Sequence, residues 1–225
     1  MATTKKKAAA PAAPAAPAAP NAFMETMKVR LTLTQELLGT ASANVALHEE
    51  HIAKKAPDAP SVEEEVEALG VDEVVEKIMT LFPRKDGVFI NWDYQIKGYF
   101  KSAASFLTRV KDTQTGKLTA FRKVIAGLVQ VTPRAIPLQI PDGEDLSNLQ
   151  RPLRAETAQG PRVALANSEV VPAGTTMEFT IHYPKLKKKE VDLEACIREW
   201  LDYGIFHGHG QWRNAGYGRF TWEEL

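Results

Sequence analysis

The most informative segment of this sequence reads Gly208-His209-Gly210-Gln211-Trp212-Arg213-Asn214-Ala215-Gly216-Tyr217-Gly218-Arg219-Phe220. Its first eleven residues include four glycines. Glycine adopts backbone angles that other residues avoid, and it has no Cβ to obstruct a ligand. Successive backbone N–H groups in such a loop can form an anion-binding concavity. Residues 208–219, called the glycine loop below, are therefore a candidate phosphate-binding site.

Four side chains of the glycine loop favour the same interpretation. Arg213 and Arg219 supply forked donors for phosphate, and Trp212 and Tyr217 offer ring faces on which a nucleobase could stack. A nucleotide-binding P-loop is not indicated, because that motif ends in Gly-Lys-Ser/Thr at a helix start. The alternative is a tight structural turn whose Trp and Tyr only pack against the protein. The expected nucleic-acid contacts in this loop are Gly208, Gly210, Trp212, Arg213, Gly216, Tyr217, Gly218 and Arg219.

The elements around the glycine loop follow from hydrophobic periodicity. A final strand is expected from Tyr217 to Trp222, and residues 190–203 predict an amphipathic helix before the loop. Further upstream, Arg162–Val171 and Thr175–Tyr183 each alternate as strands do, with turn-forming residues between them. These two segments therefore predict a β-hairpin.

The N-terminal half supplies the complementary elements. Residues 28–34 alternate strictly between apolar and polar and predict a half-buried strand. Residues 93–110 predict a helix with Asp93 as its N-cap. Residues 128–140 are rich in strand-forming residues but interrupted by prolines, which favours an edge or bent strand. The resulting order is βαββαβ, so the expected class is α+β with a ferredoxin-like, RRM-like core.

Two further segments lie outside that core. Residues 1–23 are rich in Ala and Pro and predict a disordered tail. Residues 24–225 are expected to form a single domain, with an acidic helical insertion at about 39–90. Within the insertion, one helix is expected after Ser61 and a second over 71–81. Because acids are concentrated there, the helices of 61–81 are a candidate surface for a protein partner rather than for nucleic acid.

The charge balance limits how nucleic acid could be bound. The chain has 28 Lys+Arg and 28 Asp+Glu; setting aside the three lysines of 1–23 leaves 25 basic and 28 acidic residues, a net charge of −3. Binding would therefore need a local patch rather than a global positive field. One cysteine excludes an internal disulfide framework. The absence of a signal-peptide pattern or a long apolar run predicts a cytoplasmic protein without membrane contact.

Four segments together resemble a known protein family. The glycine loop is similar to the C-terminal glycine-rich loop of the RAMP superfamily, the RNA-binding proteins of CRISPR–Cas systems. Phe89–Phe100, Val170–Phe179 and Leu31–Thr40 resemble other segments of its backbone-subunit type, in the same order. The resemblance covers about half the chain. It implies a RAMP core that binds single-stranded RNA, or single-stranded DNA, with subunits self-associating along the strand, and is compatible with a solitary relative encoded by a phage or mobile element.

The resemblance and the basic residues nominate further contacts outside the loop. The resemblance implies that Lys97, at the start of the 93–110 helix, touches phosphate, and Lys101 lies one turn later. Arg154 and Arg162 flank a Pro/Gly-containing segment and could grip phosphate as well. The alternative for all four is an ordinary solvated surface.

Catalysis is the competing interpretation. Guide-processing relatives are metal-independent endoribonucleases, and His207 and His209 beside the glycine loop are weak candidates for acid–base residues. A non-catalytic binder is favoured, and neither a metal nor a cofactor is expected. A third hypothesis is a protein-interaction module, such as a CRISPR-complex decoy. If the protein is phage-encoded, its compartment would be the bacterial cytoplasm.

Overall fold

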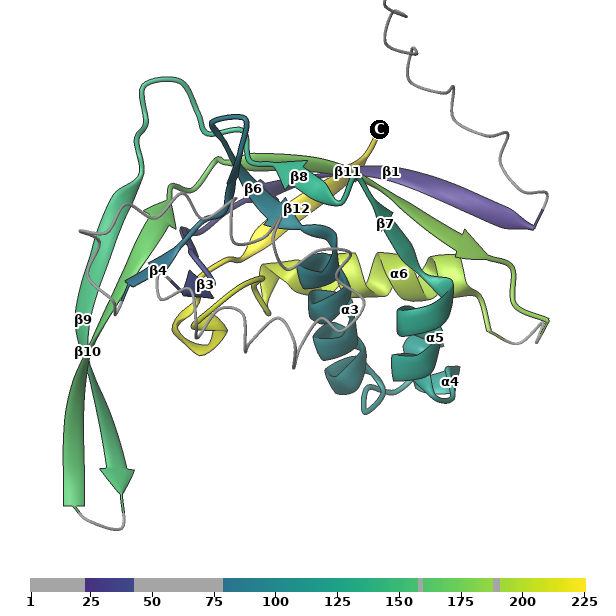
Figure 1. Ribbon diagram of the computed structural model, residues 1–225. Helices are drawn as coiled ribbons and strands as arrows, with labels where there is room; N and C mark the ends of the chain where they lie inside the picture. The colour runs from purple at the N-terminus through teal and green to yellow at the C-terminus, as the bar shows by residue number, and fades with distance from the viewer. Residues whose placement is uncertain (1–22, 43–78, 158–159, 188–190) are drawn as a thin grey trace, which may run out of the picture.

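The computed structural model describes residues 23–42, 79–157, 160–187 and 191–225, with the backbone alone for 152–157 and 160–166. The described part of the chain is α+β (Figure 1). Outside the described residues lie residues 1–22 of the predicted tail, the first predicted helix of the acidic insertion, and residues 71–78 of the second, so the predicted partner surface at 61–81 stays a prediction. None of the described helices is long and apolar enough to cross a membrane.

The main sheet is antiparallel and has the strand order β12-β1-β11-β7. Its strands are β1 (Met24–Leu33), β7 (Gln130–Thr132), β11 (Thr176–Pro184) and β12 (Phe220–Glu224). Val29 lies opposite Phe179 in the central pair, and both are buried. The alternation in 28–34 thus correctly predicted a strand with one buried face, although the strand begins earlier, at Met24.

The helices cover the apolar face of this sheet (Figure 1). They are α3 (Asp93–Leu107), α4 (Gln114–Lys117), α5 (Phe121–Leu128) and α6 (Leu193–Asp202). Both long helices were expected from the periodicity of their apolar residues. Asp93 is the first residue of α3 rather than its cap, since the N-cap is Trp92, whose backbone N–H donates to the Gln95 side chain at 2.9 Å.

The predicted hairpin between the segments 162–171 and 175–183 is wrong. Strand β10 (Gly160–Val171) pairs with β9 (Ser147–Thr157), in a ribbon that extends from the core (Figure 1). The turn after Val171 instead carries the chain from this second sheet into β11, and the N–H of Gly174 in that turn donates to the carbonyl of Leu33 at 2.7 Å. Alternation identifies strands, but it does not identify their partners.

The end of the predicted insertion also differs from expectation. Met79–Leu81, placed in the second predicted helix, form strand β4, which pairs with β3 (Ala41–Ser42) and with β10. Strands β5 (Arg84–Lys85) and β6 (Val88–Trp92) follow, and β6 pairs with β8 (Ala135–Pro137). Two residues of β2 (Leu37–Leu38) complete the second sheet. The β-branched and aromatic residues of 88–92 therefore take part in sheet pairing rather than in a helical insertion.

The other face of the main sheet is polar, and its described cations are paired. Arg30 contacts Glu178 at 2.6 Å and Glu223 at 2.7 Å, and Lys28 contacts Glu178 at 3.3 Å. Hydrogen bonding from Arg30 lowers the pKa of the Glu178 carboxyl. Because the basic side chains of β1 are neutralised locally, this face offers little free positive charge to phosphate. A nucleic-acid site is better sought on the helical side.

Candidate functional site

The glycine loop is closed at its neck by two backbone segments that pass very close together. The N–H of His209 donates to the carbonyl of Gly218 at 2.8 Å, and the N–H of Gly218 donates to that of Glu36 at 2.7 Å. A Cβ on Gly208 would overlap the Tyr217 carbonyl, and one on Gly218, whose φ is +69°, would overlap the His209 carbonyl. These two glycines are therefore required by close backbone approach.

Four of the loop's backbone donors are used within the protein. Besides the two neck amides, Ala215 donates to Trp212 and Gly216 donates to Arg213, each at 2.9 Å. These four N–H groups are not available to an anion. The formal positive charge of the loop comes from the side chains of Arg213 and Arg219.

The two aromatic residues of the loop are stacked on each other. The rings of Trp212 and Tyr217 lie 5.0 Å apart at an angle of 8°. The Arg151 guanidinium, from β9, lies over the Trp212 ring, so the loop contacts the base of the β9–β10 ribbon. A nucleobase could use the Trp212 ring only by rearranging these partners.

Arg213 anchors a polar cluster against helix α3. Its Nη1 donates to the Ser102 hydroxyl and to Nε2 of His207, both at 3.0 Å, and Ser102 lies 2.9 Å from the same nitrogen. Burial, together with the nearby Arg213 charge, lowers the pKa of His207 to about 4. The imidazole is therefore neutral at pH 7, and because Nε2 accepts from a guanidinium, the proton lies on Nδ1.

His209 is buried and lines the same pocket as Arg213. Its Nε2 lies 3.0 Å from Oδ1 of Asn91, and burial lowers its pKa to about 4, with Arg213 adding to the effect. Since Asn91 presents a carbonyl oxygen, the neutral imidazole carries its proton on Nε2. His207 and His209 are therefore neutral side chains held in opposite tautomers by their neighbours.

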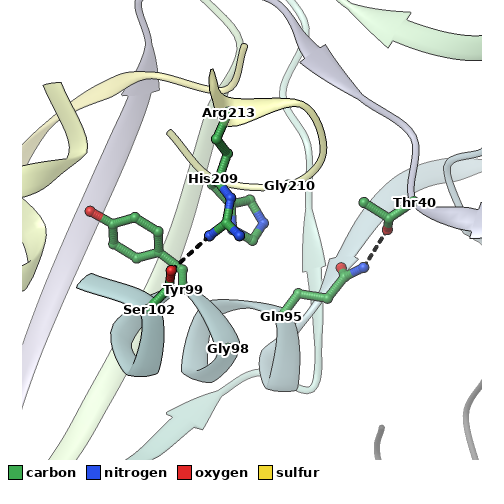
Figure 2. A pocket seen from close by; sticks show the side chains of 8 residues that line it. All are labelled: Thr40, Gln95, Gly98, Tyr99, Ser102, His209, Gly210 and Arg213. Atoms are coloured by element: carbon green, nitrogen blue, oxygen red, sulfur yellow. Dashed lines mark hydrogen bonds between the residues drawn. The ribbon is translucent and has the colours of Figure 1, made fainter. Parts of the chain in front are cut away.

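A pocket of about 280 Å³ opens between α3 and the loop (Figure 2). Arg213 projects into it from the loop, toward Ser102 on α3, while Gln95 donates to Thr40 at 2.5 Å across its other side. The lining consists of Thr40, Gln95, Gly98, Tyr99, Ser102, His209, Gly210 and Arg213. Among the described residues, this lining contains one formal cation and no carboxylate. Such a lining suits an anionic ligand with additional hydrogen-bonding groups.

Arg219 lies at the end of the loop that enters β12. Its Nε is buried and has no hydrogen-bond partner among the described residues. Neither Arg219 nor Arg213 forms an ion pair with a carboxylate in the described part of the chain. The two loop arginines therefore keep uncompensated positive charge, unlike Arg30 on the sheet.

The other predicted cationic contacts lie elsewhere. The Lys97 amino group lies 3.1 Å from the Ala126 carbonyl in α5 and 3.3 Å from the Gln130 side chain. Neither Lys97 nor Lys101 lines the pocket. Arg154 and Arg162 lie on the paired backbones of β9 and β10, where Arg162 is opposite Ala155. The structure thus places the glycine loop against one face of α3, and Lys97 and Lys101 do not line the pocket between them.

Three pocket residues on α3 were not singled out from the sequence. Gln95, Tyr99 and Ser102 follow the i, i+4, i+7 spacing that places side chains on one helix face. A polar stripe beside an apolar one on the same helix is the pattern that could have identified them. Within the described residues, no group of three His, Cys, Asp or Glu is placed to hold a metal ion.

Comparison with known proteins gives matches only among solved structures, because no family model and no curated protein matches the chain. A chain of the Type III-B Cmr-beta complex bound to cognate target RNA aligns with 90% of this chain and 59% of its own length, at 15% identity and a TM-score of 0.41. A chain of a Type IV-B CRISPR complex aligns with 89% of this chain and 90% of its own, at 12% identity and a TM-score of 0.46. In both cases the alignment extends over most of this chain, at low identity.

Proposed function

We propose that this protein binds single-stranded nucleic acid, RNA in preference to DNA, through the glycine loop and the adjoining face of α3. The observation that carries the proposal is the pair Arg213 and Arg219, which have no carboxylate partner among the described residues. Arg213 also projects into a pocket whose lining, within the described part of the chain, holds no acid. Arginines placed in this way bind phosphate strongly, because no internal ion pair has to be broken first.

The strand order supports a ferredoxin-like core of the RAMP type as the scaffold. Numbering only the main-sheet strands along the chain, β12-β1-β11-β7 reads 4-1-3-2. Helix α3 lies between the first and second of these strands, and α6 lies between the third and fourth. We propose that this βαββαβ unit positions the loop, within a single domain spanning 24–225, and that subunits assemble side by side along the bound strand.

The test removes the two loop arginines. We expect Arg213→Ala combined with Arg219→Ala to weaken binding of a labelled single strand, and to reduce the slope of log K against log salt by about 0.7 for each lost phosphate contact. The matched control is Arg122→Ala with Lys123→Ala, which removes the same charge from exposed positions on α5. If both double variants lose affinity equally, only net charge matters and the site is wrong.

The cluster of Ser102, His207 and Arg213 favours a second candidate, a metal-independent endoribonuclease. His207 is neutral at pH 7 and could act as a base once Nε2 is released from Arg213, although its lowered pKa makes it a weak one. The adjacent guanidinium could stabilise the negative charge that develops on the phosphate during cleavage. Cleavage of labelled hairpin RNA in the presence of EDTA, abolished by His207→Ala, would establish this activity. If the RNA stays intact after prolonged incubation, the endoribonuclease hypothesis is rejected and non-catalytic binding remains the proposed function.

A further inference from the structure

Exposed aromatic rings gather next to the Arg213 cluster. Phe106, at the C-terminal end of α3, is 47% exposed, and Phe206, just after the 3₁₀ turn Tyr203–Ile205 (η1), is 67% exposed. Tyr203 lies between them, with ring-centre distances of 6.2 Å to Phe106 and 6.3 Å to Phe206. Phe106, Tyr203 and Phe206 are called the aromatic patch below. Large rings exposed together on a folded protein usually mark a contact surface.

The aromatic patch is continuous with the pocket through His207. The His207 ring stacks on Tyr203 at 5.6 Å and on Tyr99 at 6.3 Å, at angles of 25° and 26°. Phe106 meets the same ring at 5.0 Å. Because Nε2 of His207 also contacts Arg213, a ligand phosphate at the guanidinium would lie one side chain away from the exposed rings.

The Arg213 charge beside the rings favours nucleobases as the ligand, while exposed Val110 and Ile205, close in sequence to Phe106 and Phe206, would suit an apolar protein segment. A cation beside exposed rings matches the alternating phosphate and base of a single strand. Arg109 follows α3 nearby, is exposed, and its backbone N–H donates to the Phe106 carbonyl at 3.0 Å. Asp202, next to Tyr203 in sequence, accepts a hydrogen bond from Trp222 at 2.8 Å and keeps its negative charge, so the phosphates of a bound strand would have to lie on the Arg213 side of the patch.

The two rings that the sequence predicted to stack on nucleobases are less available to a ligand than the aromatic patch. Trp212 and Tyr217 face each other, with Arg151 over the Trp212 ring. We therefore propose that the aromatic patch is a base-stacking platform, so that the bound strand continues from the pocket past His207 onto Phe106 and Phe206. This proposal rests on the proposed single-strand binding, and it assigns the bases to a surface that lies outside the glycine loop.

The experiment compares Phe206→Ala with Phe23→Ala. Phe23 is the matched control, since it is 66% exposed and lies at the other end of the chain. We expect Phe206→Ala to weaken binding of a short single-stranded RNA by about fivefold or more. The salt slope should not change, because no phosphate contact is lost. Phe23→Ala should bind as the unmodified protein does.

A strand of abasic sites separates stacking from other effects. With bases absent, Phe206→Ala and the unmodified protein should bind equally, and 2-aminopurine in a normal strand should be quenched only when Phe206 is present. Equal losses on normal and abasic strands would overturn the platform. So would unchanged affinity accompanied by altered self-association in sedimentation, which would assign the patch to protein contacts. If the unmodified protein binds no single strand, the proposed function itself is wrong, and the platform with it.

Discussion

Acidification should destabilise this protein through His209. The imidazole is buried, its hydrogen bond to Asn91 requires the neutral form, and its pKa falls from 6.5 to about 4 on folding. Between these values the unfolded chain binds a proton that the folded chain does not, so folding stability decreases as the pH decreases. For one such group, lowering the pH from 7.5 to 5 should cost about 2 kcal/mol of unfolding free energy.

The assay is urea unfolding at a series of pH values, for the unmodified protein and for His209→Gln. Glutamine can still donate to Asn91 but does not titrate, so the variant should lose about 2 kcal/mol less over the same pH interval. Histidine NMR titration of the unmodified protein is an independent measurement, in which two rings, those of His207 and His209, should remain neutral well below pH 6. A ring at position 209 that titrates near 6.5, or identical pH profiles for both proteins, would refute the reasoning.

Three further predictions test the packing of the site and of the helices. Gly98 and Gly127 both have open space where a Cβ would stand. Gly98→Leu and Gly127→Leu should therefore each raise the free energy of unfolding in urea by up to about 1 kcal/mol. Only Gly98→Leu should weaken binding of single-stranded nucleic acid, because Gly98 lines the pocket and its new side chain would fill it. Glu199→Ala should cost about 3 kcal/mol in the same assay, because its carboxylate accepts three hydrogen bonds at the start of α4; a loss below 1 kcal/mol would contradict this. Gly218→Ala should destabilise by several kcal/mol, far more than Gly87→Ala, which shares a positive φ but meets no neighbouring atom; equal losses would show that φ alone matters.

Much of the main sheet and both long helices were predictable, because each buries one regular face. The alternation around Val29 and the three- and four-residue spacing around Phe100 correspond to residues that are buried in the structure. The partner of β10 was not predictable, since two strands with similar alternation compete for it and the choice depends on contacts distant in sequence. Short strands such as β4 carry too few residues for any period to be recognised.

For the candidate site, residue types were more predictable than their arrangement. The sequence of the glycine loop predicted that Trp212 and Tyr217 would offer their ring faces to nucleobases. In the structure these two rings stack on each other instead. That pairing depends on the φ of +52° at Trp212, which no composition rule predicts. The role of Ser102 was likewise hidden, because serine on a helix usually means only a solvated surface. Its significance appears only when the loop brings Arg213 to it.

The neck of the glycine loop also bears on how this molecule can be altered. The His209 amide ties the two ends of the loop together, and the Gly218 amide ties this neck to Glu36. Between them, Arg213 is held by Ser102, and a Cβ on Gly210 would meet Leu37. Asn214 and Ala215 are the exposed positions of this segment, so new charge or new rings should be tolerated at these two residues rather than along the whole loop.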